Sequence, residues 1–100
     1  METQTFMVVQ ATPNPANMED LKKYGAQSYA IMEKHGGARI ANYNVEAVLD
    51  DGDKPGIIGV FSFPSAQAIQ DLLYNDAEYQ ALVLFRNKGF KVIRFFVCNA

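Results

Sequence analysis

The stretch GIIGVFSFPS, residues 56–65, decides the fold of this chain. Residues 57–63 are mostly apolar and carry no charge, which is typical of a strand that is buried on both of its faces. A turn cluster rich in Asp, Gly and Pro, residues 51–56, precedes this strand, and Pro64-Ser65 after it offers a helix cap. We therefore expect a central strand that follows a hairpin turn and leads into a helix.

The other strand of the hairpin is expected over residues 38–50, because polar and apolar side chains alternate there. Asn42, Asn44 and Glu46 fall on one side of it, so much of this strand has one polar face. The aspartates at its turn lack the ligand spacing and the closing glutamate of a calcium loop, and we expect no metal site there.

A first strand, residues 5–11, and a helix are expected before the hairpin. The prolines after this strand are expected to end it, and Asn17 offers an N-cap oxygen to the helix. The helix is expected to end at Gly36-Gly37, because glycine adopts the left-handed conformation that closes a helix. His35 then lies in the last turn, a position that suits a basic side chain beside the helix dipole.

A second helix is expected after Ser65, with a restart at Asn75 where Glu78 serves as the capping-box partner. It ends near Gly89, and residues 90–98 form the last strand. The order βαββαβ predicts an α+β fold of the ferredoxin-like type, a four-stranded antiparallel sheet with the helices on one face. The first and third strands are expected at its centre.

Both faces of the predicted sheet are apolar. The third strand places Ile57, Phe61 and Phe63 on one side and Ile58 and Val60 on the other, and the fourth strand has a similar two-sided pattern. Helices cover only one face in this fold, and a face exposed to water should be polar. We therefore expect a homodimer in which two copies pair through these sheet faces about a two-fold axis, as a dimeric α/β barrel.

The composition predicts one globular domain that spans residues 1–100. Hydrophobic residues make up 49% of the chain and charged residues 20%, far from the profile of a disordered segment. The net charge is -2 and the Lys and Arg residues form no basic stripe, so nucleic acid is not an expected partner. No apolar run approaches the roughly 20 residues of a membrane helix, and no signal peptide is evident, so we expect a cytoplasmic protein without a membrane partner.

Four groups of residues form motifs spread over most of the chain. They are Tyr24 with His35-Gly36-Gly37, then Leu49-Asp50-Asp51-Gly52, then Phe63-Pro64-Ser65 with Ala68, and finally Glu78-Tyr79-Gln80 with Arg86. Together they resemble the uncharacterised domain-of-unknown-function family thirteen-thirty, within the dimeric α/β-barrel superfamily. The chain departs from the family pattern at residues 42–44, which read Asn-Tyr-Asn where Arg-Gly-Gly is common. The resemblance implies ferredoxin-like protomers that pair sheet to sheet, and it implies no known activity.

The sequence supports two hypotheses about function. In the first, the homodimer binds a small organic molecule in a pocket near the sheet, or a partner protein, and the aromatic and methionine side chains supply an adaptable lining. In the alternative, the protein is a cofactor-free enzyme that acts on a small aromatic or carboxylate substrate. The resemblance suggests a monooxygenase or isomerase type, because the wider superfamily includes such enzymes.

The enzyme hypothesis assigns roles to four residues. His35 is the candidate general base, and Tyr43, Tyr79 and Arg86 are the candidate ligand-binding residues. Three of them have a structural alternative: His35 as a helix end, Tyr79 as a core anchor, and Arg86 as the ion-pair partner of Glu78 or a cap of the carbonyls near Gly89. The sequence contains no metal-ligand cluster and no phosphate-binding loop, so neither a metal nor a cofactor is expected.

Overall fold

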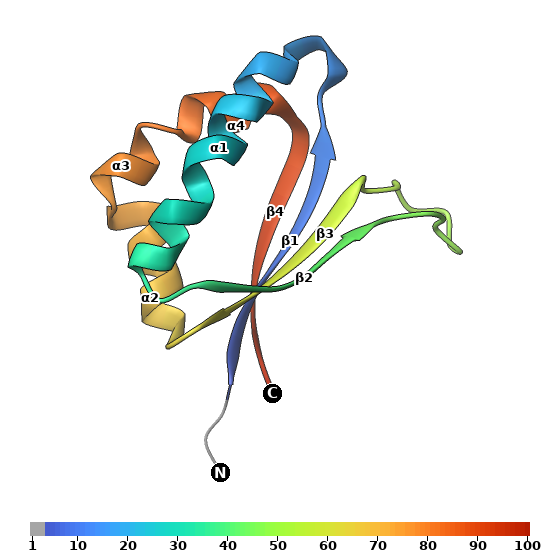
Figure 1. Cartoon of the computed structure of the whole chain (residues 1–100). Coiled ribbons are helices and arrows are strands. Elements are labelled where there is room, and N and C mark those ends of the chain that lie inside the picture. The colour runs from blue at the N-terminus through green and yellow to red at the C-terminus, as the bar shows by residue number, and fades with distance from the viewer. Residues whose placement is uncertain (1–3) are drawn as a thin grey trace.

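Four antiparallel strands form one sheet, and the helices lie together on one of its faces (Figure 1). The computed structural model describes residues 4–100. Its elements are β1 (Thr5–Pro13), the 3-10 turn η1 (Pro15–Asn17), α1 (Met18–Lys34), β2 (Ala38–Asn44), β3 (Ile57–Phe63), α2 (Ala66–Gln70), the π-helical turn η2 (Asp71–Asn75), α3 (Ala77–Gln80), α4 (Val83–Gly89) and β4 (Phe90–Asn99). The strand order β2-β3-β1-β4 confirms the predicted ferredoxin-like α+β fold, with the first and third strands at the centre.

Alternate side chains of the central strands form the core between sheet and helices. Met7 pairs with Phe61 of β3 and with Val97 of β4, and its side chain is completely buried. The other buried apolar residues are Val9, Ala11, Tyr24, Ile31, Met32, Phe61, Phe63, Ile69, Leu72, Tyr79 and Leu82. They come from β1, β3 and the helix layer, so burial of one sheet face holds the two layers together.

The opposite face of the sheet carries a second set of apolar side chains. Val8 of β1 lies between Val60 of β3 and Phe96 of β4, and all three are partly exposed. Phe6 and Ile58 occupy neighbouring positions on the same face. The predicted two-sided apolar pattern is therefore confirmed, whereas pairing of this face with a second copy stays a prediction.

α1 is the longest helix and turns its apolar side toward the sheet. It buries Tyr24, Ser28, Ile31 and Met32, a spacing typical of an amphipathic helix. Among the helices that residues 4–100 form, none is long and apolar enough to cross a membrane.

The end of α1 confirms the prediction made from the glycine pair. Gly36 has a φ of +83°, and its N–H donates to the Glu33 carbonyl at 2.9 Å. A Cβ at this position would lie 2.6 Å from Cγ of Pro64. Both the left-handed backbone and the lack of space therefore require glycine here.

α1 and α4 approach closely at another glycine. A Cβ on Gly89 would lie 2.6 Å from the Leu21 Cα, so only glycine allows this separation of the two backbones. The amide of Asn17 donates to the Lys88 carbonyl at 3.0 Å and joins the same two helices. The predicted role of Asn17 was wrong, because its side chain makes no capping hydrogen bond to α1.

β1 is longer than the sequence indicated. The strand continues to Pro13 instead of ending near Ala11, because a bulge after Thr12 keeps it in register with Phe90 of β4. Proline cannot donate to the hydrogen-bond ladder of a sheet, and a bulge is one of the positions where it is tolerated.

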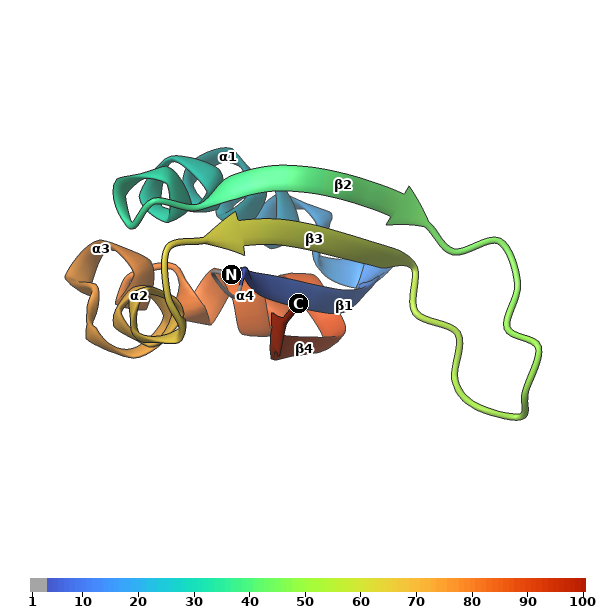
Figure 2. The same cartoon turned by 90° about the horizontal axis from the view of Figure 1, so that it is seen from below.

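β2 is shorter than the sequence indicated. It ends at Asn44 instead of residue 50, and residues 45–56 form a loop that extends away from the sheet (Figure 2). The Val45 N–H donates to the Gly56 carbonyl at 3.0 Å and closes the base of this loop. Leu49, which lies within the predicted strand of residues 38–50, is fully exposed.

Candidate functional site

An apolar cavity of about 220 Å³ lies between α1 and the sheet. Aromatic rings form much of its wall: Tyr24, Tyr29, Phe61, Phe90 and Phe95. No acidic residue lines it within the described chain. A mainly apolar hollow with few polar groups is the usual setting of a small-molecule site.

Two glycines line this cavity. Gly25 lies in the middle of α1, and a Cβ built on it would meet no heavy atom within 4 Å. Gly59 lies in the middle of β3 and lines the same cavity. Glycine weakens a helix interior by about 1 kcal/mol relative to alanine. Because a Cβ at position 25 would meet no atom, close packing does not require glycine there.

Arg39 and Asn42 of β2 bring polar side chains to the cavity. The Arg39 guanidinium lies 4.9 Å from the ring centroid of Tyr29 and 5.8 Å from that of Phe61. The Arg39 backbone N–H donates to the Tyr29 hydroxyl at 3.2 Å, which fixes the strand against α1. Within residues 4–100 the guanidinium itself has no carboxylate within ion-pair distance. The wall of the cavity therefore includes an exposed arginine whose charge is not neutralised by a neighbour within residues 4–100.

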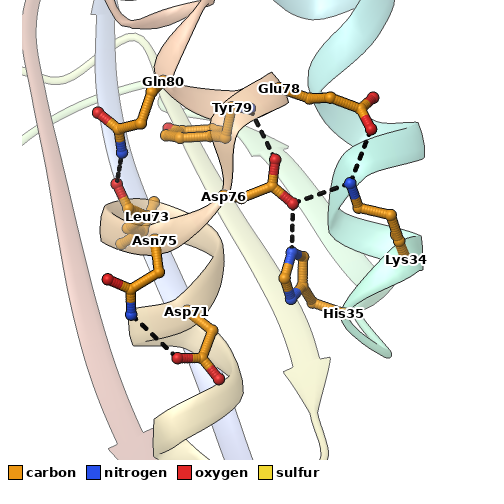
Figure 3. A network of polar contacts seen from close by, with 9 residues as sticks. All are labelled: Lys34, His35, Asp71, Leu73, Asn75, Asp76, Glu78, Tyr79 and Gln80. Carbon is orange, nitrogen blue, oxygen red and sulfur yellow. Dashed lines mark hydrogen bonds and ion pairs between the residues drawn. The ribbon is translucent and has the colours of Figure 1, made fainter.

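A second, polar hollow lies where the end of α1 meets the start of α3 (Figure 3). It has a volume of about 420 Å³, is open to solvent, and shares no lining residue with the apolar cavity. Its central contact joins His35 Nε2 to Asp76 Oδ2 at 2.6 Å. Lys34 Nζ approaches the same Asp76 oxygen at 2.9 Å and also contacts Glu78 at 2.9 Å.

Asp76 holds this network together from a buried position. Its side chain is only 5% exposed, and its other carboxylate oxygen accepts the Tyr79 N–H at 2.9 Å as the N-cap of α3. The hydrogen bonds from His35 and Lys34, followed by that from the Tyr79 N–H, hold the Asp76 pKa far below its usual range. The predicted N-cap at Asn75 was therefore wrong by one residue.

The residues around Asp76 have other partners than the sequence indicated. Asn75 donates its amide to Asp71 at 3.1 Å (Figure 3). Hydrogen bonds from Gln67 and from Asn75 lower the Asp71 pKa. Glu78 does not serve as a capping-box partner of Asn75, because Glu78 contacts Lys34 and the cap is Asp76.

Buried hydroxyl groups join α1 to α3. The phenolic oxygens of Tyr24 and Tyr79 lie 2.8 Å apart, and Arg86 Nη1 donates to the Tyr79 oxygen at 3.1 Å. Tyr79 is completely buried, and burial raises the Tyr24 pKa well above its usual value. Both phenol oxygens thus have hydrogen-bond partners, as polar atoms in a core require.

The structure brings some of the predicted site residues together but not all. Tyr79 contacts Arg86 through its hydroxyl and Asp76 through its backbone, and Asp76 contacts His35. Tyr43 pairs with Ile58 on the opposite face of the sheet and is 59% exposed, so it lies apart from the others.

Sequence reasoning missed Arg39, Asn42 and Asp76. Arg39 gave a weak signal as the one basic residue of its predicted strand, and Asp76 is as good an N-cap residue as its neighbour Asn75. Asn42 gave no signal beyond lying on the polar side of that strand.

Comparisons with known proteins identify the family and support the fold. The chain belongs to the family described as domain of unknown function DUF1330, whose model matches residues 4–99. No curated protein sequence matches it.

Several solved structures have the same fold. The methylated RPA0582 protein, known from Rhodopseudomonas palustris as a protein of unknown function, is 19% identical with a TM-score of 0.81, over 100% of this chain and 82% of that one. PA3566 from Pseudomonas aeruginosa is 12% identical with a TM-score of 0.67, over 100% and 96% of the two chains. A nipsnap family protein of unknown function from Agrobacterium tumefaciens is 12% identical with a TM-score of 0.64, over 97% and 87%.

Proposed function

We propose that this DUF1330 chain forms a homodimer that binds a small organic molecule in the apolar cavity between α1 and the sheet. The observation that carries the binding proposal is the open space at Gly25, in a helix position where alanine would be more stable. A cavity of about 150 Å³ is known to accept benzene, so the 220 Å³ here has room for a substituted aromatic ring.

Filling the cavity from Gly25 tests this proposal. The chain has no tryptophan, so the fluorescence of indole, used as the probe, can be excited selectively during a titration. We expect Gly25→Leu to weaken indole binding at least tenfold, because its side chain occupies the open space, and Gly25→Ala to change it less than threefold. Indole binding that is equal in Gly25→Leu and the wild type would refute the cavity as the site.

The dimer proposal rests on the apolar sheet face opposite the helices. An interface of standard size, about 1,600 Å² and roughly 60% apolar, gives a gross gain on the order of 20 kcal/mol. Association costs of about 4 to 15 kcal/mol leave room for a stable dimer.

Two valines of β4 provide a matched test of the dimer. Val92 lies on the face opposite the helices and is 53% exposed, while Val97 lies on the helix side and is 50% exposed. We expect sedimentation at micromolar concentration to show a dimer that Val92→Glu dissociates and Val97→Glu leaves intact. A wild-type monomer at that concentration would contradict the proposal.

A cofactor-free enzyme is the second candidate, and the contact between His35 and Asp76 favours it. A carboxylate within 2.6 Å of an imidazole orients the ring and supports proton transfer, and the polar hollow gives a small substrate access to it. Mass spectrometry after incubation with small aromatic and carboxylate compounds tests this candidate. We expect a genuine turnover to fall at least a hundredfold in His35→Gln at an unchanged melting midpoint, whereas turnover that survives the change would exclude His35 as the base.

A further inference from the structure

We propose that the ligand of the apolar cavity carries a carboxylate or a similar planar oxyanion, and that Arg39 binds it. This inference rests on the proposed small-molecule function and names the chemical class of the ligand. Among the residues that line the cavity, Arg39 alone carries a charge, and no acidic residue lines it within the described chain. The cavity is thus electrostatically complementary to a small anion with an apolar body.

The surroundings of Arg39 differ from those of the basic residues at the end of α1. Lys34 forms ion pairs with two carboxylates, those of Asp76 and Glu78, so its charge is neutralised within the protein. The Arg39 guanidinium lies instead over the rings of Tyr29 and Phe61, both of which line the cavity. Arg39 is an exposed residue, and the N–H donors of its guanidinium make no hydrogen bond within residues 4–100.

The geometry of a guanidinium suits this ligand class. Its planar fork of N–H donors matches the two oxygens of a carboxylate, and such paired, charge-assisted hydrogen bonds are stronger than neutral ones. Asn42 lies in the same strand and lines the same cavity, so its amide supplies a further polar group beside the anion. The aromatic walls then receive the apolar body of the ligand.

A simpler explanation is that Arg39 only packs its side chain over two aromatic rings, as arginines often do on protein surfaces. That explanation predicts no preference for anions. Lys23 provides the comparison, because its ammonium lies 5.1 Å from the ring centroid of Phe85 and it does not line the cavity. A role in anion binding should therefore be lost with the charge of Arg39 and kept when the charge of Lys23 is removed.

The test compares benzoate with benzamide, a neutral molecule of nearly the same shape, by isothermal titration of the purified full chain. We expect the wild type to bind benzoate at least tenfold more tightly than benzamide. Arg39→Met keeps much of the apolar stem and removes the charge, so it should weaken benzoate binding at least tenfold and change benzamide binding less than threefold. Lys23→Met should preserve the benzoate preference.

The outcomes separate this inference from the proposed function beneath it. Equal binding of benzoate and benzamide by the wild type, or an unchanged benzoate preference in Arg39→Met, would overturn the carboxylate assignment alone. If indole binds in the cavity but neither probe does, the carboxylate assignment is again overturned and the binding function stands. If indole, benzoate and benzamide all fail to bind, the proposed function is overturned together with this inference.

Discussion

Replacing Asp76 tests whether the buried carboxylate holds α1 and α3 together. Asp76→Ala removes the N-cap of α3 and the contacts with His35 and Lys34, whereas Asp76→Asn keeps an oxygen that can accept the Tyr79 N–H. The difference in the free energy of unfolding between the two variants measures the contribution of the cap. The difference between Asp76→Asn and the wild type measures the contribution of the charge.

The magnitudes follow from these contacts. Loss of an N-cap costs about 1 kcal/mol. Loss of a partly buried, charge-assisted hydrogen bond, here the one between Asp76 and His35, costs about 1 to 2 kcal/mol. Lys34 adds little, because its side chain is 48% exposed and solvent screens the pair. We therefore expect the free energy of unfolding at pH 7 to fall by about 1 to 2 kcal/mol in Asp76→Asn and by about 2 to 3 kcal/mol in Asp76→Ala.

Urea unfolding at a series of pH values measures both losses, with the protein concentration held constant because association would add to stability. The Asp76 pKa is lowered in the folded state and about 3.9 in the unfolded state, so below about pH 5 the unfolded chain takes up more protons. The stability from this carboxylate is fully present above that range and is lost as the pH falls toward the folded pKa. The difference in the free energy of unfolding between the wild type and Asp76→Asn should therefore become smaller as the pH falls below about 5.

Two results would refute this reasoning. If Asp76→Asn is as stable as the wild type at pH 7, the contacts with His35 and Lys34 contribute nothing to folding. If Asp76→Asn is less stable than the wild type but this difference does not decrease between pH 5 and pH 3, the cause is a change in packing and not the charge of Asp76.

Four further substitutions test single features by their melting midpoints. His35→Gln should cost no more than about 1 kcal/mol, because glutamine can still donate to the buried carboxylate; a larger loss would show that the ring itself is needed. Gly36→Val should cost about 2 kcal/mol through its left-handed backbone, and no change would mean that α1 does not end there. Gly89→Ala should cost about 1 to 3 kcal/mol, because its methyl group would meet the Leu21 backbone, and a neutral result would show that the helices separate freely. Gly25→Ala should instead stabilise the chain by up to about 1 kcal/mol, and destabilisation would show that the space beside it is not open.

The fold could be predicted from the sequence because its signals are local. The apolar run at residues 57–63, the Gly36-Gly37 helix end and the Ser65 cap each depend on a few neighbouring residues, and the structure confirms all three. The βαββαβ order then leaves few ways to arrange the sheet.

The errors occurred where a local pattern had a non-local competitor. Asn17 could have capped α1, but its amide contacts Lys88, which is distant in the sequence. Asn75 and Asp76 are equally good caps in isolation, and the contacts of Asp76 with the end of α1 decide between them. The alternating pattern of residues 45–50 does not form a strand, because the hairpin pairing of β2 with β3 ends at Asn44.

The cavity was beyond sequence reasoning for a different reason. Gly25 of α1 and Arg39 of β2 both line it, and neither leaves a periodic signal in the sequence. From the sequence alone, Gly25 is only a residue of low helix propensity within a predicted helix, and Arg39 is only a charged residue within a predicted strand.

The polar hollow and the apolar cavity share no lining residue, yet a continuous set of contacts joins them. Asp76 fixes the first turn of α3 through the Tyr79 N–H, and the Tyr79 hydroxyl contacts that of Tyr24, whose side chain lines the cavity. Because Tyr79 is completely buried, it has little freedom to adjust independently of either neighbour. The charged network at the end of α1 therefore has a structural role that does not depend on catalysis: it holds in place the tyrosine that supports one wall of the proposed ligand site.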